Sequence, residues 1–163
     1  MEMTSAEREL KFEDRHRIDQ ARHNPARKTH PDPLEPKLEC PLGRLRLKGL
    51  ISEPEYQAGV SWRHAYFSYL WSIGAPNPFP GSSGAEFGTT GNPDSRMDQM
   101  TDEEAERAAK VYKSGLSILQ AKGKRVLHAV NAVAVFEEPE ELGDFEYTSK
   151  AAKIGLAALA ASF

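Results

Sequence analysis

The residues best suited to binding chemistry are three cations, Arg44, Arg46 and Lys48, which alternate with leucines. In an extended segment successive side chains point to opposite faces, so the three cations would share one face and Leu45 and Leu47 the other. A row of cations of this kind suits a phosphate group or an acidic protein surface. The simpler alternative is an amphipathic segment that covers the core while its charges remain solvated.

A second set of cations lies in residues 110–125, a window that contains no acidic residue. Such a patch would bind phosphates in a salt-dependent way, although charge runs on helices are often only solvated. Residues 137–146 show the opposite bias, with six acids and no base. The candidate nucleic-acid contacts of the basic window are Lys122, Lys124 and Arg125.

Residue types that support catalysis are present but are not arranged for it. Cys40 is the only cysteine, which excludes an internal disulfide, and no positioned base can be inferred beside it. The first three histidines are seven residues apart, but Pro25 interrupts the helix that would align them and no further ligand completes a metal set. We therefore expect no catalytic residue, metal, cofactor or small-molecule substrate, so that the protein is not an enzyme.

The composition fits one domain preceded by a tail, since the chain has 163 residues. A net charge of -3 does not indicate a general nucleic-acid coat, so any polyanion binding must come from local clusters. The charged N-terminal region does not resemble a secretory signal, and the apolar stretches are too short to span a bilayer. With its single cysteine, the chain is expected to be cytoplasmic and to have no membrane partner.

The elements that must position the cations are predicted to be helices. Residues 1–40 are charged and broken by prolines, which predicts a flexible arm with at most a short polar helix through about Ala21. Residues 41–163 are expected to form a single helical domain. Within it, residues 74–98 are rich in glycine and proline and are predicted to form a long loop.

The first long helix is predicted to start at Ser52, because Glu55 follows three residues later as in a capping box, and to stop at Gly74. Its apolar face is wider than one stripe, so we expect it to be central to the core or shared with a partner. Aromatic residues commonly anchor interfaces. The candidate partner-binding residues are Trp62, Tyr66 and Tyr69.

Three further helices are predicted. A second capping signature at Thr101 begins one that Gly123 interrupts or ends, and a third reaches about Phe136. The last starts near Thr148 or Ser149 and is rich in alanine, which offers few side chains for reading bases. The succession of helix, acidic turn and helix has the outline of a helix-turn-helix unit.

Several short motifs follow one another in the chain, namely Pro41-Leu42-Gly43, Leu50-Ile51-Ser52, Gln57-Ala58-Gly59 and Gly155-Leu156-Ala157-Ala158-Leu159-Ala160. With the long helix and the proline-rich break between them, they resemble the sigma-factor-like C-terminal domain of gene-transfer-agent activators and related phage-borne antitermination regulators. The resemblance implies a small all-α domain with a C-terminal unit similar to sigma region 4, and it implies that Tyr147, Lys150 and Lys153 lie on a DNA-contacting helix.

The function implied by the resemblance is transcription regulation through RNA polymerase or its sigma factor. It implies late expression of phage or gene-transfer-agent genes by activation or antitermination. We expect the aromatic helix to dock on the polymerase while the basic segments lie along nascent RNA or upstream DNA. Two alternatives remain open: a phage-type helix-turn-helix protein that binds an operator or packaging site unaided, and an oligomeric adaptor with no nucleic-acid role.

Overall fold

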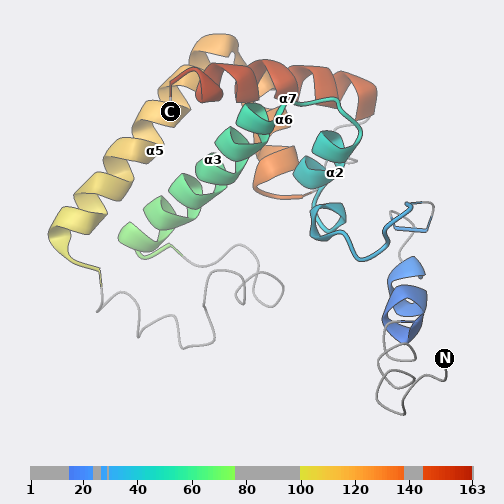
Figure 1. Ribbon diagram of the computed structural model, residues 1–163. Coiled ribbons are helices and arrows are strands. Elements are labelled where there is room, and N and C mark those ends of the chain that lie inside the picture. The colour runs from blue at the N-terminus through green and yellow to red at the C-terminus, as the bar shows by residue number, and fades with distance from the viewer. Residues whose placement is uncertain (1–14, 24–26, 29, 76–99, 138–144, 163) are drawn as a thin grey trace.

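The computed structural model describes residues 15–23, 27–28, 30–75, 100–137 and 145–162. Within these ranges every regular element is a helix, as Figure 1 shows, so the predicted all-helical class is confirmed. The elements are a 3₁₀ helix η1 (Pro36–Leu38) and the α-helices α2 (Pro41–Leu47), α3 (Glu53–Ser72), α5 (Asp102–Lys122), α6 (Lys124–Ala134) and α7 (Phe145–Ala160). Residues 15–22 are also helical. None of the helices described here has the length and apolar character needed to cross a bilayer.

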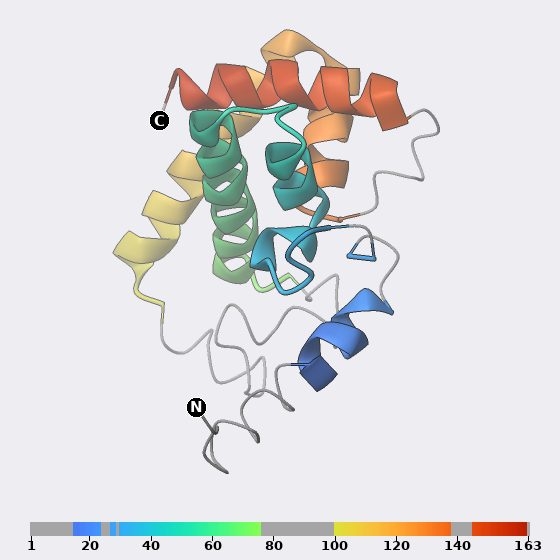
Figure 2. The same ribbon diagram turned by 45° about the vertical axis from the view of Figure 1, so that its right-hand side comes forward.

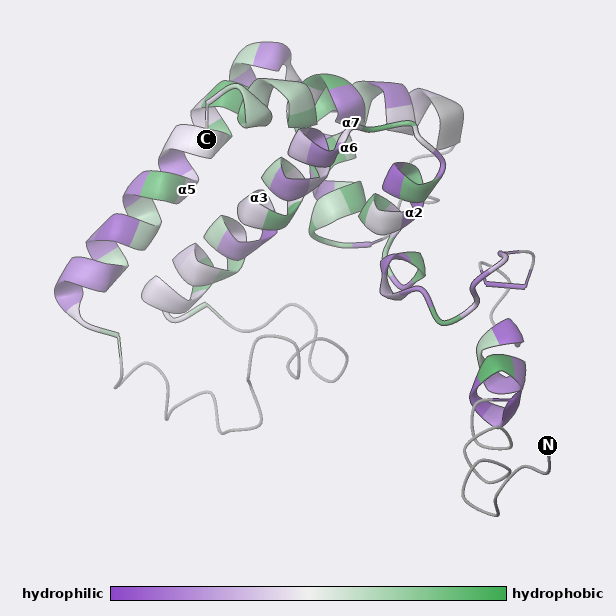
Figure 3. Ribbon diagram, in the orientation of Figure 1, coloured by the Kyte–Doolittle hydropathy of each residue, from purple (hydrophilic) through white to green (hydrophobic). Residues whose placement is uncertain are grey.

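Helix α3 is the centre of the domain. It runs beside α5, and α7 lies across the ends of both helices in the two views of Figures 1 and 2. The core that these helices share is closed by large side chains with no exposed surface, among them Trp62, Leu119, Leu156 and Leu159. In Figure 3 the N-terminal half of α5 is largely hydrophilic, which agrees with its position beyond this core.

The ends of the long helices follow the predicted local signals. Ser52 and Glu55 form a reciprocal capping box at the start of α3, and Thr101 and Glu104 form another at the start of α5. Gly74 adopts a φ of 64° just beyond α3, where the amides of residues 74 and 75 bond back to the last turn. These predictions are confirmed. The predicted loop over residues 74–98 lies almost wholly outside the described residues.

Glycines allow the helices to cross closely. A Cβ atom added at Gly115 of α5 would lie 2.7 Å from the Trp62 ring, and one added at Gly155 of α7 would lie 2.4 Å from Val130 of α6. Neither distance is compatible with an unmoved neighbour, because carbon atoms in contact lie about 3.5–4.0 Å apart. The α3–α5 and α6–α7 contacts therefore both depend on a missing side chain.

The extended conformation considered for residues 44–48 is wrong, because α2 is a helix. The Cys40 sulfur accepts a hydrogen bond from the Gly43 amide at 3.3 Å, and Pro41 occupies the first helical position. Gly49 then ends the helix with a φ of 69°. Leu45 is fully buried and Leu47 is exposed, so the two leucines do not share a face.

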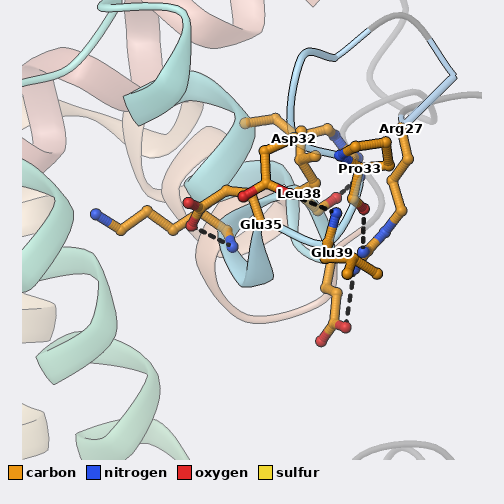
Figure 4. Close-up of polar contacts among 9 residues, drawn as sticks. Arg27, Asp32, Pro33, Glu35, Leu38 and Glu39 are labelled. Carbon is orange, nitrogen blue, oxygen red and sulfur yellow. Dashed lines mark hydrogen bonds and ion pairs between the residues drawn. The ribbon is translucent and has the colours of Figure 1, made fainter. Parts of the chain in front are cut away.

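Residues 27–28 and 30–40, within the predicted N-terminal arm, make specific contacts with one another and with α2. Arg27 is buried, and its guanidinium donates to the Pro33 carbonyl at 2.7 Å and to the Glu39 carboxylate at 2.8 Å (Figure 4). Leu38 of η1 is buried as well, and η1 packs on α2. Prolines break regular structure here, but the Arg27 hydrogen bonds hold the resulting turns together. The predicted polar helix through about Ala21 is helical over residues 15–22, and its part before residue 15 lies outside the described residues.

Helix α7 begins at Phe145, three residues before the predicted start. Helices α6 and α7 pack against each other, as a helix-turn-helix unit requires. Residues 138–144, which connect them, lie outside the described residues. The likeness of this pair to sigma region 4 therefore stays a prediction.

Candidate nucleic-acid interface

A groove with a volume of about 350 Å³ lies between the first turns of α6 and the N-terminal half of α7. It is the surface on which sequence-predicted binding residues from distant parts of the chain come together. The described residues that line it are Lys124, Arg125, His128, Ala129, Tyr147, Thr148 and Ala151.

The α6 side of the groove follows directly from helical spacing. Gly123, with a φ of 108°, ends α5 and immediately precedes α6. In the first turns of α6, Lys124, Arg125 and His128 are exposed, while Val126 and Ala129 are buried. The start of α6 has no side-chain cap, so its backbone dipole adds to the positive potential of the two cations.

The α7 side of the groove contributes an aromatic ring. Tyr147 is 53% exposed, and its hydroxyl accepts a hydrogen bond from Arg125 Nη1 at 3.3 Å. This bond joins the two walls across the groove. Ala129 and Ala151 are both buried and give the groove a small apolar floor.

Among the residues that the structure describes, the lining of the groove holds two permanent cations and a histidine but no carboxylate. The acidic stretch of residues 137–146 begins at Glu137, whose charge is already paired within the fold. Glu137, just beyond the other end of α6, forms an ion pair with Arg63 of α3. The arrangement can hold a phosphate at the cationic rim and an apolar group on the floor.

The remaining basic residues predicted on these helices are not among the described residues that line the groove. Lys122 is exposed at the end of α5, and Lys150 and Lys153 are exposed on α7.

The α2 cations have structural contacts. Arg44 donates to the Leu38 carbonyl at 3.3 Å, and Arg46 donates to the Glu53 carboxylate at 2.8 Å. The Arg46 hydrogen bond holds the pKa of Glu53 below its usual range. Lys48 is exposed just beyond α2. The predicted row of three cations on one face is therefore not formed.

The predicted docking role of Trp62 is corrected by its burial, since the side chain has no exposed surface. Its indole N–H donates to Asn131 Oδ1 at 2.9 Å, and its ring stacks on Tyr112 of α5 with centroids 5.4 Å apart. Tyr69 stacks on the same tyrosine at 4.3 Å, and Tyr66 meets it edge to face. We call Trp62, Tyr66, Tyr69 and Tyr112 the aromatic cluster.

Sequence reasoning missed His128 and the alanine floor. His128 follows Lys124 by four residues and Arg125 by three, so helical spacing alone could have placed it with them. Ala129 and Ala151 carried no comparable signal, because alanine is ordinary in a helix and only the packing of α6 on α7 makes it a floor.

Nothing in the described geometry activates Cys40, because burial raises the pKa of its thiol and so disfavours the nucleophilic thiolate. Within the part of the chain that the structure describes, no three His, Cys, Asp or Glu residues gather in a way that could hold a metal ion. Comparison of the chain with protein-family models, with curated proteins and with solved structures found no match.

Proposed function

We propose that this protein is a transcription regulator that binds RNA polymerase or its sigma factor and contacts nucleic acid through the α6–α7 groove. In this proposal it promotes late phage or gene-transfer-agent gene expression by antitermination. The observation that carries the nucleic-acid part is the meeting of Lys124, Arg125 and Tyr147 in one groove. The polymerase part is supported by the resemblance of the sequence motifs.

The groove favours a polyanion over an isolated small anion. Its cations lie on an exposed rim, and Lys122, Lys150 and Lys153 are exposed on the neighbouring helix surfaces. A ligand with charges repeated along its length can extend from the rim to lysines that are exposed on α5 and α7. Binding of this kind weakens steeply as salt rises, because each neutralised phosphate releases counterions.

Docking on the polymerase must avoid the buried part of α3. Trp62 is inside the core, so contacts made through this helix fall on the partly exposed Tyr66 and Tyr69. Both rings also stabilise the contact with α5, and a partner would meet their edges instead of inserting them into its own pockets.

The test combines a pull-down with purified RNA polymerase and an in vitro terminator read-through assay. Wild-type protein is expected to bind the polymerase and to raise read-through. The double variant Lys124→Ala/Arg125→Ala should retain polymerase binding and lose most read-through.

The matched control is Lys110→Ala/Lys113→Ala, which removes two exposed cations from α5 outside the groove lining. It should behave as wild type. Absence of both polymerase binding and read-through in the wild-type protein would contradict the proposed function.

Autonomous binding to duplex DNA is a second candidate function, because Lys150 and Lys153 are exposed on α7. It predicts a salt-sensitive gel shift without polymerase, which Lys150→Ala or Lys153→Ala weakens. A gel shift that is unchanged in both variants would exclude α7 as the DNA-contacting helix.

A further inference from the structure

We infer that the α6–α7 groove binds single-stranded RNA by taking up one base against the Tyr147 ring while Lys124 and Arg125 hold the adjoining phosphates. This inference rests on the proposed function and deepens it, because it names the form of nucleic acid that the groove accepts. It is carried by the combination of an apolar floor, an exposed aromatic wall and a cationic rim.

The apolar floor separates single strands from duplexes. Ala129 and Ala151 form a small buried surface that a flat apolar group can cover. In a duplex the faces of the bases are stacked on one another, and the exterior offers only phosphates, sugars and base edges. A single strand exposes base faces, which stack on aromatic side chains. The duplex would use the cations and leave the floor empty.

The aromatic wall is held ready for stacking. Arg125 Nη1 bonds to the Tyr147 hydroxyl at the tip of the ring, which restrains the ring while leaving 53% of the residue exposed. A restrained ring loses less conformational freedom when a base stacks on it. The contact also places the Arg125 charge beside the ring, where the phosphate next to a stacked base would lie.

The size and charge of the groove match one nucleotide unit. Its volume of about 350 Å³ lies at the lower end of the range typical of sites for small organic groups. Lys124, Arg125 and His128 are donors in the lining, and the part of the lining that the structure describes holds no carboxylate as a competing acceptor. Charge complementarity therefore selects an anionic occupant, and the floor selects one that carries a flat apolar part.

The single strand is RNA because of where the proposed function places the protein. On a transcribing polymerase, the strand that leaves the enzyme unpaired is the transcript. A groove that holds one of its bases would keep that base from pairing in a terminator hairpin. This provides a direct physical route to antitermination without any chemistry on the RNA.

The experiment measures binding by fluorescence anisotropy with an end-labelled RNA of mixed sequence, about 12 nucleotides long, within the site sizes of known single-strand binders. Single-stranded DNA of the same sequence and the corresponding duplex DNA are the comparison ligands. Both single strands are expected to bind more tightly than the duplex, because only they expose base faces to the Tyr147 ring. Binding to the duplex that is as tight as binding to the RNA would overturn the assignment.

The variants test stacking separately from charge. Tyr147→Ala should weaken RNA binding about tenfold, whereas Tyr147→Phe, which keeps the ring, should stay within about twofold of wild type. Lys124→Ala/Arg125→Ala should weaken binding and flatten its salt dependence, and Lys110→Ala/Lys113→Ala should do neither. Equal affinities of Tyr147→Ala and wild type would overturn the inference.

Failure of the inference is distinguishable from failure of the proposed function. If the protein binds polymerase and causes read-through but does not bind free RNA, the inference fails and the proposed function stands. If RNA binding depends on Tyr147 but polymerase binding and read-through are absent, the inference is supported and the proposed function fails.

Discussion

The α3–α5 contact and the α6–α7 contact use aromatic residues in opposite ways. Between α3 and α5, Tyr112 is stacked between Trp62 and Tyr69, and Trp62 has no exposed surface. Between α6 and α7, Tyr147 is more than half exposed beside Lys124 and Arg125. The first set of rings stabilises the fold, whereas the second region leaves an aromatic residue largely exposed.

This difference shows that aromatic residue type alone does not predict which rings are exposed. Trp62, Tyr66 and Tyr69 were the obvious anchors in the sequence, yet they pack on another helix of the same chain. Tyr147 lies in an alanine-rich helix, and Lys124 and Arg125 are beside it only because α7 packs on α6. The two regions should therefore respond differently to substitution.

The largest expected effect is the loss of the aromatic cluster by Trp62→Ala. Removing a fully buried ring should lower the free energy of unfolding by about 3–5 kcal/mol, and it also leaves Asn131 without the indole donor. Urea unfolding followed by circular dichroism measures this change. Trp71→Ala is the control, because Trp71 is only partly buried and should lose clearly less. If Trp62→Ala and Trp71→Ala lowered the free energy of unfolding equally, the burial of Trp62 in the aromatic cluster would not be the source of its effect.

The sharpest test of the comparison is a pair of tyrosine variants. Tyr112→Ala removes the ring shared by three aromatic contacts and should lower the free energy of unfolding by about 2–4 kcal/mol. Tyr147→Ala removes an exposed ring and should change it by no more than about 0.5 kcal/mol. Thermal and urea unfolding of both variants check this. A strongly destabilised Tyr147→Ala would assign that ring to the fold instead of the ligand.

A smaller stability effect is expected at the α6–α7 crossing. Gly155→Ala places a methyl group 2.4 Å from Val130 and 2.8 Å from Val126, so the helices must separate, at about 1–3 kcal/mol. Unfolding measurements should show the loss. At an exposed helix position the same change from glycine to alanine stabilises by up to about 1 kcal/mol, so the sign of the effect is diagnostic. Lys153→Ala, an exposed neighbour, should be nearly neutral.

The smallest expected effect is on the alkaline stability of the aromatic cluster. Burial raises the pKa of both Tyr66 and Tyr112. The folded state therefore binds these protons more tightly than the unfolded state. The resulting contribution to the free energy of unfolding is complete below the ordinary tyrosine pKa of about 10. It is lost as the pH rises through the higher pKa of the folded state.

The measurement is urea unfolding at about pH 8 and about pH 10.5, on either side of the ordinary tyrosine pKa. Cys40→Ser serves as the background, because the raised pKa of the Cys40 thiol gives a change of the same sign and serine retains the helix cap. Within this background, Tyr66→Phe/Tyr112→Phe should reduce the loss of stability at high pH. An unchanged loss would show that these hydroxyls are not its source.

Local signals predicted the long helices well. The capping boxes at Ser52 and Thr101 and the stop at Gly123 depend on residues within a single turn, so the sequence contains all that is needed to recognise them. Helix α2 could not be recognised in this way. Over only seven residues, the alternating leucines fit a strand period of two about as well as a helix. In the structure α2 is capped by Cys40 and packs on η1, and the leucine pattern indicates neither feature.

The candidate site was only partly predictable. Lys124, Arg125 and Tyr147 each stood out by residue type, but their meeting depends on α7 crossing α6 at Gly155. Such a crossing is fixed by close packing between distant segments, which no local pattern encodes. The same limitation explains the buried Arg27, since its partners Pro33 and Glu39 are brought to it only by the turns of the chain.

The covering of α3 by elements far along the chain has a consequence for biosynthesis. Trp62 finds its hydrogen-bond partner in α6, and Gly59 finds its neighbour Leu156 in α7. A growing polypeptide therefore exposes the aromatic face of α3 until Tyr112 of α5 has been synthesised, and the Gly59 region of the same helix until α7 has followed. Throughout that interval we expect α3 to present apolar surface to the surroundings, which makes an incomplete chain prone to aggregation.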